Sequence, residues 1–463
     1  MRIAIIGAGL AGLTAAYELR LHDVEVFEAA GRIGGKLYSV PFNDGPTDMG
    51  AEAFLARRRD AVDFFHTLGL AGSLVDPSGL RSLVYSGELK ALPQGGVMGI
   101  PSHSAPVAHL VSQDTARRID NEQPFDWTVG GDVSVGELVR RQYGGDLVDR
   151  VVSALLGGVY SCTADDLGLR ATIPTLADAL DALDALATSG PVTLSAAVRS
   201  VEEARGDNPS AGGPVFQTFS GGYAELYETL AEKSHAKIFV DTFISEIVRE
   251  GDKFRLAGAP GDSALFDRVL VATPAPTAAR LLSKVTAEAA TRLKGVKLAA
   301  SAVVGLKFES DIDPSGTALP QNSGILVATD QDDVHAKAFT LSSRKWPHLA
   351  QRGGALVRAS FGRFGDDAIV SAAEDTLVDY ALDDLQHLTG FDGRATGVTE
   401  IFTQRWFGGL PRFDATHLET VAAVRDALSQ SPGVDVTGAW AGGVGVPAVI
   451  ADARAAAARI ASS

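Results

Sequence analysis

The sequence predicts an α/β fold on three observations. The chain opens with an apolar strand, Arg2 to Ile6, followed by glycines at positions 7, 9 and 12 and an apolar-periodic stretch. A second strand, 24–28, ends in the carboxylate of Glu28. Much later, the run 268–274 has the pattern of a buried strand ended by a proline turn. Together these features indicate a Rossmann-type dinucleotide-binding domain that resumes after an insertion.

The glycine-rich turn is expected to hold a dinucleotide. Glycines let the backbone approach a pyrophosphate, and the helix amino-terminus offers N–H groups and the positive end of its dipole. Glu28 lies 21 residues after Gly7, where its carboxylate can accept hydrogen bonds from ribose hydroxyls. A GxGxxG pattern alone is a weak signal, but the strand before it, the helix after it and the carboxylate supply the required context.

FAD is the dinucleotide that the sequence favours. A flavoprotein that also used NAD(P) would usually need a second glycine-rich fingerprint, and the sequence has none. The charge of Glu28 would repel the 2′-phosphate of NADP. The pair Gly34-Gly35, followed by Lys36, adds backbone donors and a cation beside the phosphates.

Bulk composition narrows the class of protein. The 463 residues are 46% apolar and 21% charged, which excludes a disordered chain. A formal charge of −16 disfavours nucleic acid as a partner. The single cysteine, Cys162, rules out an intrachain disulfide and is expected to be a packing residue. No apolar run approaches the ~18 residues of a spanning helix, and no signal peptide is recognisable, so we expect a cytoplasmic protein.

Local patterns divide the chain into five segments. Residues 1–75, 211–295 and 404–463 are predicted to form the FAD-binding domain. Residues 76–210 are predicted to be a mainly helical insertion that builds the substrate cavity; Ser134 and Glu137 have capping-box spacing there. Residues 296–403 mix predicted strands with a helix and suit a mixed-sheet α+β substrate domain. Near the end, a second glycine-rich loop, 438–447, opens an alanine-rich helix whose dipole can face the cofactor.

Several motifs resemble those of a known superfamily. GAGLAG (7–12), EAAGRIGGK (28–36), DMGAEAF (48–54), VLVATPAP (269–276) and GAWAGGVGVP (438–447) occur in order. The chain resembles the flavin-containing amine oxidase and protoporphyrinogen oxidase superfamily over nearly its whole length. Four further segments are similar to those of the coproporphyrinogen III oxidase branch found in Gram-positive bacteria: LPQGGVMGIP (92–101), GGVYSCTADDLGLRATIP (157–174), FSGGYAEL (219–226) and RWFGGLPRF (405–413).

The resemblance implies an activity and a cofactor site. The activity is six-electron oxidation of coproporphyrinogen III to coproporphyrin III in haem biosynthesis, with O₂ reduced to hydrogen peroxide. The implied FAD-binding residues are Gly7, Ala8, Gly9, Leu10, Ala11, Gly12, Glu28, Ala29, Arg32, Gly35, Lys36, Gly50, Ala51, Glu52, Ala53, Ile244, Trp406, Val444, Gly445 and Val446. Glu52 is a departure, because eukaryotic protoporphyrinogen oxidases tend to carry arginine there, and this weakens an assignment to protoporphyrinogen.

The flavin is expected to carry the chemistry, so we predict neither a catalytic triad nor a metal site. A porphyrinogen with four propionates would need arginines or lysines at the rim of its cavity. Arg57 and Arg170 are candidates for that rim, and Met98 for the cavity wall. Each also has a structural interpretation: Arg57 as part of a solvated charge run with Arg58 and Arg59, and Met98 as an ordinary core residue.

Other functions remain open from the sequence alone. The enzyme alternatives are a protoporphyrinogen IX oxidase, an amine oxidase and a carotenoid desaturase-like flavoenzyme. The non-enzyme alternative is a flavin- or porphyrin-binding partner of a chelatase. The expected partners are the porphyrinogen and O₂, with a downstream ferrochelatase as a candidate recipient of the product.

Overall fold

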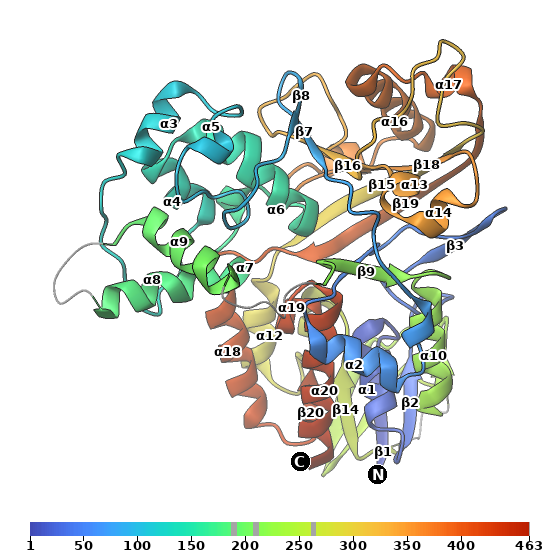
Figure 1. Cartoon of the computed structure of the whole chain (residues 1–463). Coiled ribbons are helices and arrows are strands. Elements are labelled where there is room, and N and C mark those ends of the chain that lie inside the picture. The colour runs from blue at the N-terminus through green and yellow to red at the C-terminus, as the bar shows by residue number, and fades with distance from the viewer. Residues whose placement is uncertain (187–191, 207–212, 261–264, 463) are drawn as a thin grey trace.

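A computed structural model describes residues 1–186, 192–206, 213–260 and 265–462. Figure 1 shows three regions: a parallel sheet with its helices, where both termini lie; a group of helices, drawn from cyan to green; and a second, larger sheet. The strand β9 (Phe216–Phe219) crosses between the parallel sheet and the two upper regions.

The parallel sheet contains five strands in the order β10-β2-β1-β14-β20, and all neighbours run parallel. Its strands are β1 (Arg2–Ile6), β2 (Asp23–Phe27), β10 (Lys237–Phe239), β14 (Arg268–Val271) and β20 (Val434–Val436). The strands predicted at 2–6, 24–28 and 268–274 are therefore confirmed as neighbours in one sheet. The short strand β20, on the outer edge, was not predicted.

Side-chain alternation along β1 gives this sheet two buried faces. Ile3 and Ile5 pack in one cluster with α1 (Leu10–Glu18), α2 (Arg59–Thr67), α10 (Ala224–Ser234) and α20 (Val446–Ser462). Ala4 and Ile6 pack in another, against the small sheet β11 (Glu246–Glu250), β12 (Lys253–Ala257) and β13 (Leu265–Phe266), and against α11 (Ala275–Leu282), α12 (Ala287–Lys294) and α18 (His417–Ser429).

The second sheet has seven strands in the order β19-β15-β18-β17-β16-β7-β8, antiparallel except for the β16–β7 pair. They are β7 (Leu83–Tyr85), β8 (Leu89–Ala91), β15 (Leu298–Phe308), β16 (Gly324–Val327), β17 (Ala338–Thr340), β18 (Ala355–Phe361) and β19 (Val398–Pro411). The helix α16 (Glu374–Thr389) covers one face. Shorter helices in this region are α13 (Ser342–Lys345), α14 (Pro347–Ala350), α15 (Asp367–Val370) and α17 (Gly393–Thr396).

The helical region packs around its own apolar core. Its helices are α3 (Gln113–Asp120), α4 (Val135–Gln142), α5 (Gly145–Leu147), the π-helical turn Val148–Val152, α6 (Ser153–Tyr160), α7 (Leu169–Thr172), α8 (Pro174–Leu186) and α9 (Leu194–Gly206). The predicted cap at Ser134 is present, because its hydroxyl accepts a hydrogen bond from the Glu137 N–H at 3.2 Å. Cys162 is fully buried, and burial raises its pKa to about 12.

Two predicted segment boundaries differ from the structure. The boundary at 403/404 falls inside β19, which pairs with β15 as far as Pro411, with an irregularity between the Ala299–Leu410 and Ser301–Trp406 pairs. Strands β7 and β8 join the same sheet, although 76–210 was predicted to be mainly helical. These strands are only three residues long, so their period is too short to recognise in the sequence.

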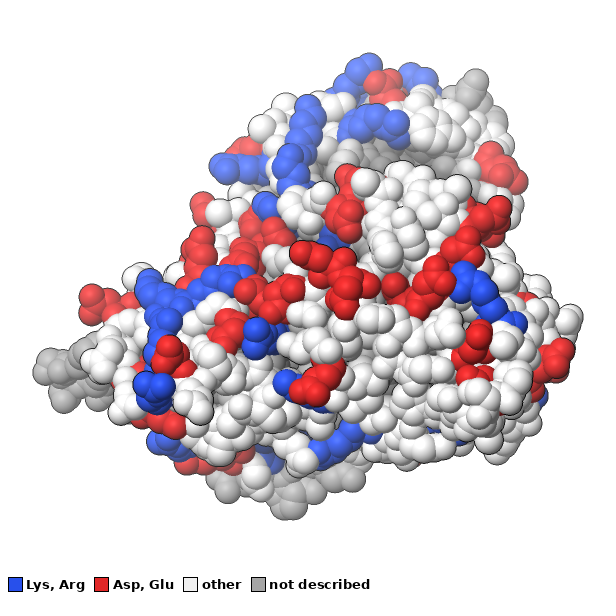
Figure 2. All heavy atoms as spheres, turned by 90° about the horizontal axis from the view of Figure 1, so that it is seen from above, with Lys and Arg blue, Asp and Glu red and all other residues white. Residues whose placement is uncertain are grey.

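The remaining short elements connect the regions. The hairpin β3 (Ser39–Phe42) and β4 (Gly45–Asp48) precedes a small sheet formed by β5 (Phe54–Leu55), β6 (Leu74–Val75) and β9, and α19 (Ala439–Gly442) precedes α20. Within the part of the chain that the structure describes, no helix is long and apolar enough to cross a membrane. Basic and acidic side chains are interspersed on the face shown in Figure 2.

Candidate cofactor site

Two glycine-bearing loops meet backbone to backbone beyond the carboxyl end of β1. Gly7 has φ +106°, and a Cβ there would lie 2.7 Å from the Ala272 carbonyl oxygen, so only glycine fits. The Gly34 N–H donates to the Ala8 carbonyl at 2.8 Å. A Cβ on Gly35 would lie 2.9 Å from the Cα of Gly9. The sequence brings these loops together because small residues stand on both sides.

Gly9 differs from these glycines, because the protein's own packing does not require it. Among the described residues, a Cβ there would meet only the Cα of Gly35 at 3.7 Å, an ordinary contact. Its φ of −76° is open to any residue, and it begins α1 without a side-chain cap. The space in front of the first-turn N–H groups of α1 therefore suits an approaching phosphate, the group that a helix amino-terminus prefers.

Glu28 lies at the end of β2, with its carboxylate fixed by backbone donors. One oxygen accepts from the Ala8 N–H at 2.8 Å and the other from the Ala30 N–H at 2.9 Å. Each oxygen keeps further acceptor capacity for a ribose hydroxyl. The Thr242 N–H donates to the Glu28 carbonyl at 2.8 Å and so holds the segment leading to Ile244 beside it.

Ile244 is buried, and among the described residues neither its N–H nor its C=O makes a hydrogen bond. A buried backbone normally pairs both groups. This free donor–acceptor pair, close to Glu28, matches the polar edge of an adenine.

Lys36 and Arg32 supply positive charge to the glycine loops. Within the described residues, Lys36 has no carboxylate within 4.0 Å, and burial lowers its pKa to about 8. An ammonium in that position is stabilised by an anion such as a diphosphate. The Arg32 guanidinium lies over the Tyr38 ring at 3.9 Å and donates to the Gly35 carbonyl at 2.6 Å, so it holds the loop in shape.

The two glycine loops, 7–12 and 34–36, together with the amino-terminus of α1 are called the cradle below. The segment Gly50 to Ala53 connects this cradle to the seven-stranded sheet. A Cβ on Gly50 would overlap the Lys36 carbonyl oxygen, so the two segments touch. The Gly50 carbonyl accepts from Arg358 on β18 at 2.9 Å. The preceding carbonyl, of Met49, accepts from the indole N–H of Trp406 on β19 at 3.0 Å. The predicted contacts Gly50 and Trp406 thus lie in one place.

The side chain of Glu52 forms its hydrogen bonds with residues of the sheet domain and not with the cradle. Its carboxylate accepts from Lys345 at 3.1 Å, from Trp346 at 3.0 Å and from Ser342 at 3.3 Å. Burial alone would raise its pKa, but the charges of Lys345 and Arg358 outweigh that effect and hold the pKa below its usual range. Any cofactor contact of Glu52 would therefore come from its backbone.

Val444, Gly445 and Val446 lie at the amino-terminus of α20. This helix packs against α1, and Val446 shares a buried cluster with Leu10. Since α1 follows β1 and α20 follows β20, both helices begin beyond the carboxyl ends of strands in the same parallel sheet. Two helix dipoles therefore converge on the edge where ligands of such sheets bind.

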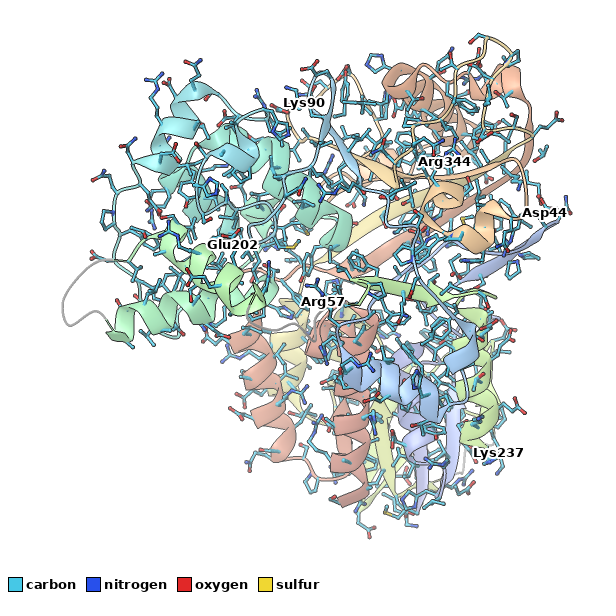
Figure 3. All side chains as sticks on the ribbon, viewed as in Figure 1. Asp44, Arg57, Lys90, Glu202, Lys237 and Arg344 are labelled. Carbon is cyan, nitrogen blue, oxygen red and sulfur yellow. The ribbon has the colours of Figure 1, made fainter. Side chains whose placement is uncertain are left out.

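The predicted substrate residues are not brought together. The prediction that Arg170 binds a substrate propionate is corrected by the structure. Its guanidinium donates to both oxygens of Asp181 at 2.9 Å and to the Gly131 carbonyl at 3.0 Å, so it has no free pair of N–H groups for a propionate. Met98 has φ +49° and packs against the core of the helical region. Arg57 is exposed, and among the described residues no carboxylate pairs with it. In Figure 3 it lies between the helical region and the parallel sheet.

Four polar residues near Gly50 were not singled out from the sequence: Asp48, Lys345, His348 and Arg358. Asp48 belongs to the DMGAEAF motif, so the motif carried a signal for it. Burial raises its pKa to about 6, even though it accepts hydrogen bonds from Ser39 and the Tyr223 N–H. The other three reach the site only through the fold of the seven-stranded sheet.

Comparison with known proteins identifies the family of this chain. The family model described as flavin containing amine oxidoreductase matches residues 10–461. The coproporphyrinogen III oxidase of Mycobacterium tuberculosis is 38% identical over 96% of this chain and 94% of its own length, and that of Bacillus subtilis is 29% identical over 98% and 96%. A solved Exiguobacterium structure described as a protoporphyrinogen oxidase superposes with a TM-score of 0.84, at 24% identity over 99% of this chain and 98% of its own. The chain therefore belongs to the flavin containing amine oxidoreductase family, in the group of the coproporphyrinogen III oxidases.

Proposed function

We propose that this chain is an FAD-dependent oxidase that converts coproporphyrinogen III to coproporphyrin III, with O₂ as acceptor and hydrogen peroxide as product. The observation that carries this proposal is the 38% identity, over 96% of the chain, to the mycobacterial coproporphyrinogen III oxidase. The reaction belongs to the coproporphyrin-dependent route of haem biosynthesis.

The cradle described above fits the proposed cofactor. Glu28 would bind the ribose, Ile244 the adenine, and Lys36 with the amino-terminus of α1 the diphosphate. The segment Gly50 to Ala53, the indole of Trp406 and the amino-terminus of α20 would surround the ring system. When bound, the flavin accepts the hydride; the protein positions the substrate and excludes competing reactions.

Arg57 is the remaining candidate for a propionate contact, since its guanidinium is exposed and without a carboxylate partner in the described part of the chain. Met98 stays a candidate for the cavity wall. A cytoplasmic location and transfer of the product to a ferrochelatase are also part of this proposal; the described residues contribute only that none of their helices can cross a membrane.

Protoporphyrinogen IX is the second candidate substrate. A plant protoporphyrinogen oxidase, from Arabidopsis thaliana, is 23% identical over 97% of this chain. The two porphyrinogens differ in charge, because coproporphyrinogen carries four propionates and protoporphyrinogen two. A basic rim would therefore favour the former.

The test compares these substrates directly. The flavin-loaded protein is incubated in air with coproporphyrinogen III, protoporphyrinogen IX or a panel of amines, while porphyrin fluorescence and peroxide are recorded. Fluorescence that rises fastest with coproporphyrinogen, with one peroxide for each electron pair, is the expected result. Faster turnover of protoporphyrinogen, or turnover of amines alone, would refute the proposal.

A further inference from the structure

A small polar cavity lies on the sheet-domain side of the Gly50 segment. Its volume is about 20 Å³, and its lining includes Thr47, Asp48, Glu52, Thr218, His348 and Arg358. A buried water needs roughly 10–15 Å³ and two to four polar partners. The cavity therefore has room for one water molecule and for no larger ligand.

Several polar atoms of the residues that line this cavity lack partners within the described part of the chain. Among the described residues, no hydrogen bond is made by the hydroxyls of Thr47 and Thr218, the Nδ1 of His348, or the Nε and Nη1 of Arg358, and all five atoms are buried. The Arg358 Nη1 lies 3.7 Å from the nearer Glu52 oxygen, too far for a hydrogen bond. Five unpaired buried atoms on residues around one water-sized space indicate a bound water, which can pair with up to four of them.

The cavity is adjacent to the surface at one end. An open groove of about 650 Å³ runs between α2, β9 and α14 and is lined by Arg59, His66, Asp76, Gln217 and His348. His348 lines both the groove and the cavity, so this residue lies between them. Of the two residues next to His348 in α14, Pro347 lines the groove and Leu349 lines the cavity.

The other end of the cavity reaches the proposed flavin site. Arg358 lines the cavity and also donates to the Gly50 carbonyl at 2.9 Å. Asp48 is two residues from Gly50, and its carboxylate accepts from the Tyr223 N–H at 3.1 Å. Asp48 and His348 therefore both line the cavity, and His348 also lines the groove that opens to solvent.

We propose that these residues form a water-bridged proton relay, in which Asp48, a bound water and His348 connect the flavin site to the groove. The inference rests on FAD as the cofactor but not on the identity of the porphyrinogen. O₂ takes up two electrons and two protons to become hydrogen peroxide. With reduced, anionic flavin bound, both electrons and one proton would come from the cofactor, and the relay would deliver the second proton from solvent.

The protonation states of the groups in this cluster suit such a relay. Burial, and then the charge of Arg352, lower the pKa of His348 to about 4, so its imidazole is neutral at pH 7 and has one donor and one acceptor nitrogen. Burial raises the pKa of Asp48 to about 6, close enough to pH 7 for its carboxyl group both to bind and to release a proton. The other charged and titratable groups around this pair are Glu52, Lys345, Arg358, Arg352, Tyr223 and Tyr227, and Arg59, His66 and Asp76 line the groove beside His348.

The relay is tested on the flavin-loaded protein without any porphyrinogen. The flavin is photoreduced and then mixed with O₂ in a weakly buffered solution that contains a pH-indicator dye, and proton uptake is followed in stopped flow. We expect His348→Leu and Asp48→Asn each to slow proton uptake by about tenfold or more, within the range that a positioned proton donor contributes. Bound flavin per chain is measured for every variant.

Asp384→Asn is the matched control. Asp384 is also a buried carboxylate whose pKa is raised by burial, and it accepts from the N–H groups of His335 and Ala336, but it lies in the seven-stranded sheet domain outside the cavity. Its substitution should leave proton uptake unchanged. If His348→Leu loses its flavin, Thr218→Val replaces it, since this change removes one lining hydroxyl at nearly constant shape.

A crystal structure of the flavin-loaded protein gives a readout independent of turnover. We expect one ordered water within hydrogen-bond distance of at least two of the five unpaired atoms. A cavity without water, or wild-type proton uptake in both variants, would overturn the relay. Failure to oxidise coproporphyrinogen would overturn the proposed function and leave this test unaffected.

Discussion

Replacing Gly9 by alanine separates a cofactor requirement from a folding requirement. The new methyl group would sit 3.7 Å from the Cα of Gly35 and would meet nothing closer among the described residues. It would, however, occupy the space in front of the α1 amino-terminus, where a phosphate is expected. The neighbouring Gly12 provides the contrast, because a Cβ there would overlap the Gly7 carbonyl oxygen.

The expected magnitudes follow from these contacts. Alanine has less conformational freedom than glycine in the unfolded chain, and this difference stabilises the folded state by about 0.4–1 kcal/mol. Alanine is also a poorer helix N-cap than glycine, and this difference destabilises the folded state by about 0.5–1 kcal/mol. Gly9→Ala should therefore leave the free energy of unfolding of the flavin-free protein unchanged within about 0.5 kcal/mol. Gly12→Ala forces the backbone apart and should cost about 1–3 kcal/mol.

Denaturant unfolding of the flavin-free proteins measures the free energy of unfolding. Titration with FAD, monitored by the quenching of its fluorescence, measures the affinity for the cofactor. Gly9→Ala should weaken FAD binding by about 10- to 100-fold, which corresponds to roughly 1.4–2.8 kcal/mol. Wild-type FAD affinity in this variant would refute the placement of the diphosphate. Destabilisation as large as that of Gly12→Ala would show that Gly9 is a packing glycine.

Three further predictions concern charged groups. Arg170→Ala should destabilise the helical region by about 1–3 kcal/mol, because the hydrogen bonds to Asp181 are lost. It should change the KM values for coproporphyrinogen and protoporphyrinogen by the same factor; unequal changes in a steady-state assay would support the substrate role predicted from the sequence. Glu52→Gln leaves the charges of Lys345 and Arg358 unbalanced and should cost about 3 kcal/mol at pH 7 in urea unfolding; because the Glu52 pKa is lowered, this difference should shrink as the pH falls below its ordinary value of 4.5. Burial lowers the pKa of Lys337 to about 7, so between pH 7 and 10.5 the unfolded chain binds a proton that the folded chain has released, and Tm should rise over that range. Lys337→Met should make this rise smaller and leave the part contributed by Lys36, whose pKa burial lowers to about 8; an unchanged rise would contradict the assignment.

The parallel sheet could be predicted because its signals are local. The glycine spacing, the run 2–6 and the carboxylate at Glu28 lie within 30 residues, and each reports on its own backbone. The structure confirms the strand–turn–helix unit that they predict. The edge strand β20 is only three residues long, too short for a period-two pattern, and was missed for that reason.

The sheet-domain side of the candidate site could not be predicted in the same way. Arg358 reaches the Gly50 carbonyl, and Trp406 the Met49 carbonyl, across 308 and 357 residues of sequence. Arginine in a strand has no local signature that distinguishes a partner in another domain from solvent. Arg170 shows the reverse error: a cation within a family-like motif suggested substrate, but the fold supplied Asp181 as its partner.

These long-range bonds give the proposed flavin site a dependence on both sheets. The parallel sheet provides the glycine cradle and two helix amino-termini, features that favour phosphate binding. The position of the Gly50 segment, in contrast, is fixed by donors on β18 and β19, and buried carbonyls without those donors would each cost about 1–3 kcal/mol. Movement of the seven-stranded sheet relative to the parallel sheet would therefore disturb the segment beside the ring system while leaving the phosphate cradle in place. Cofactor affinity and reactivity are consequently expected to depend on different parts of this chain.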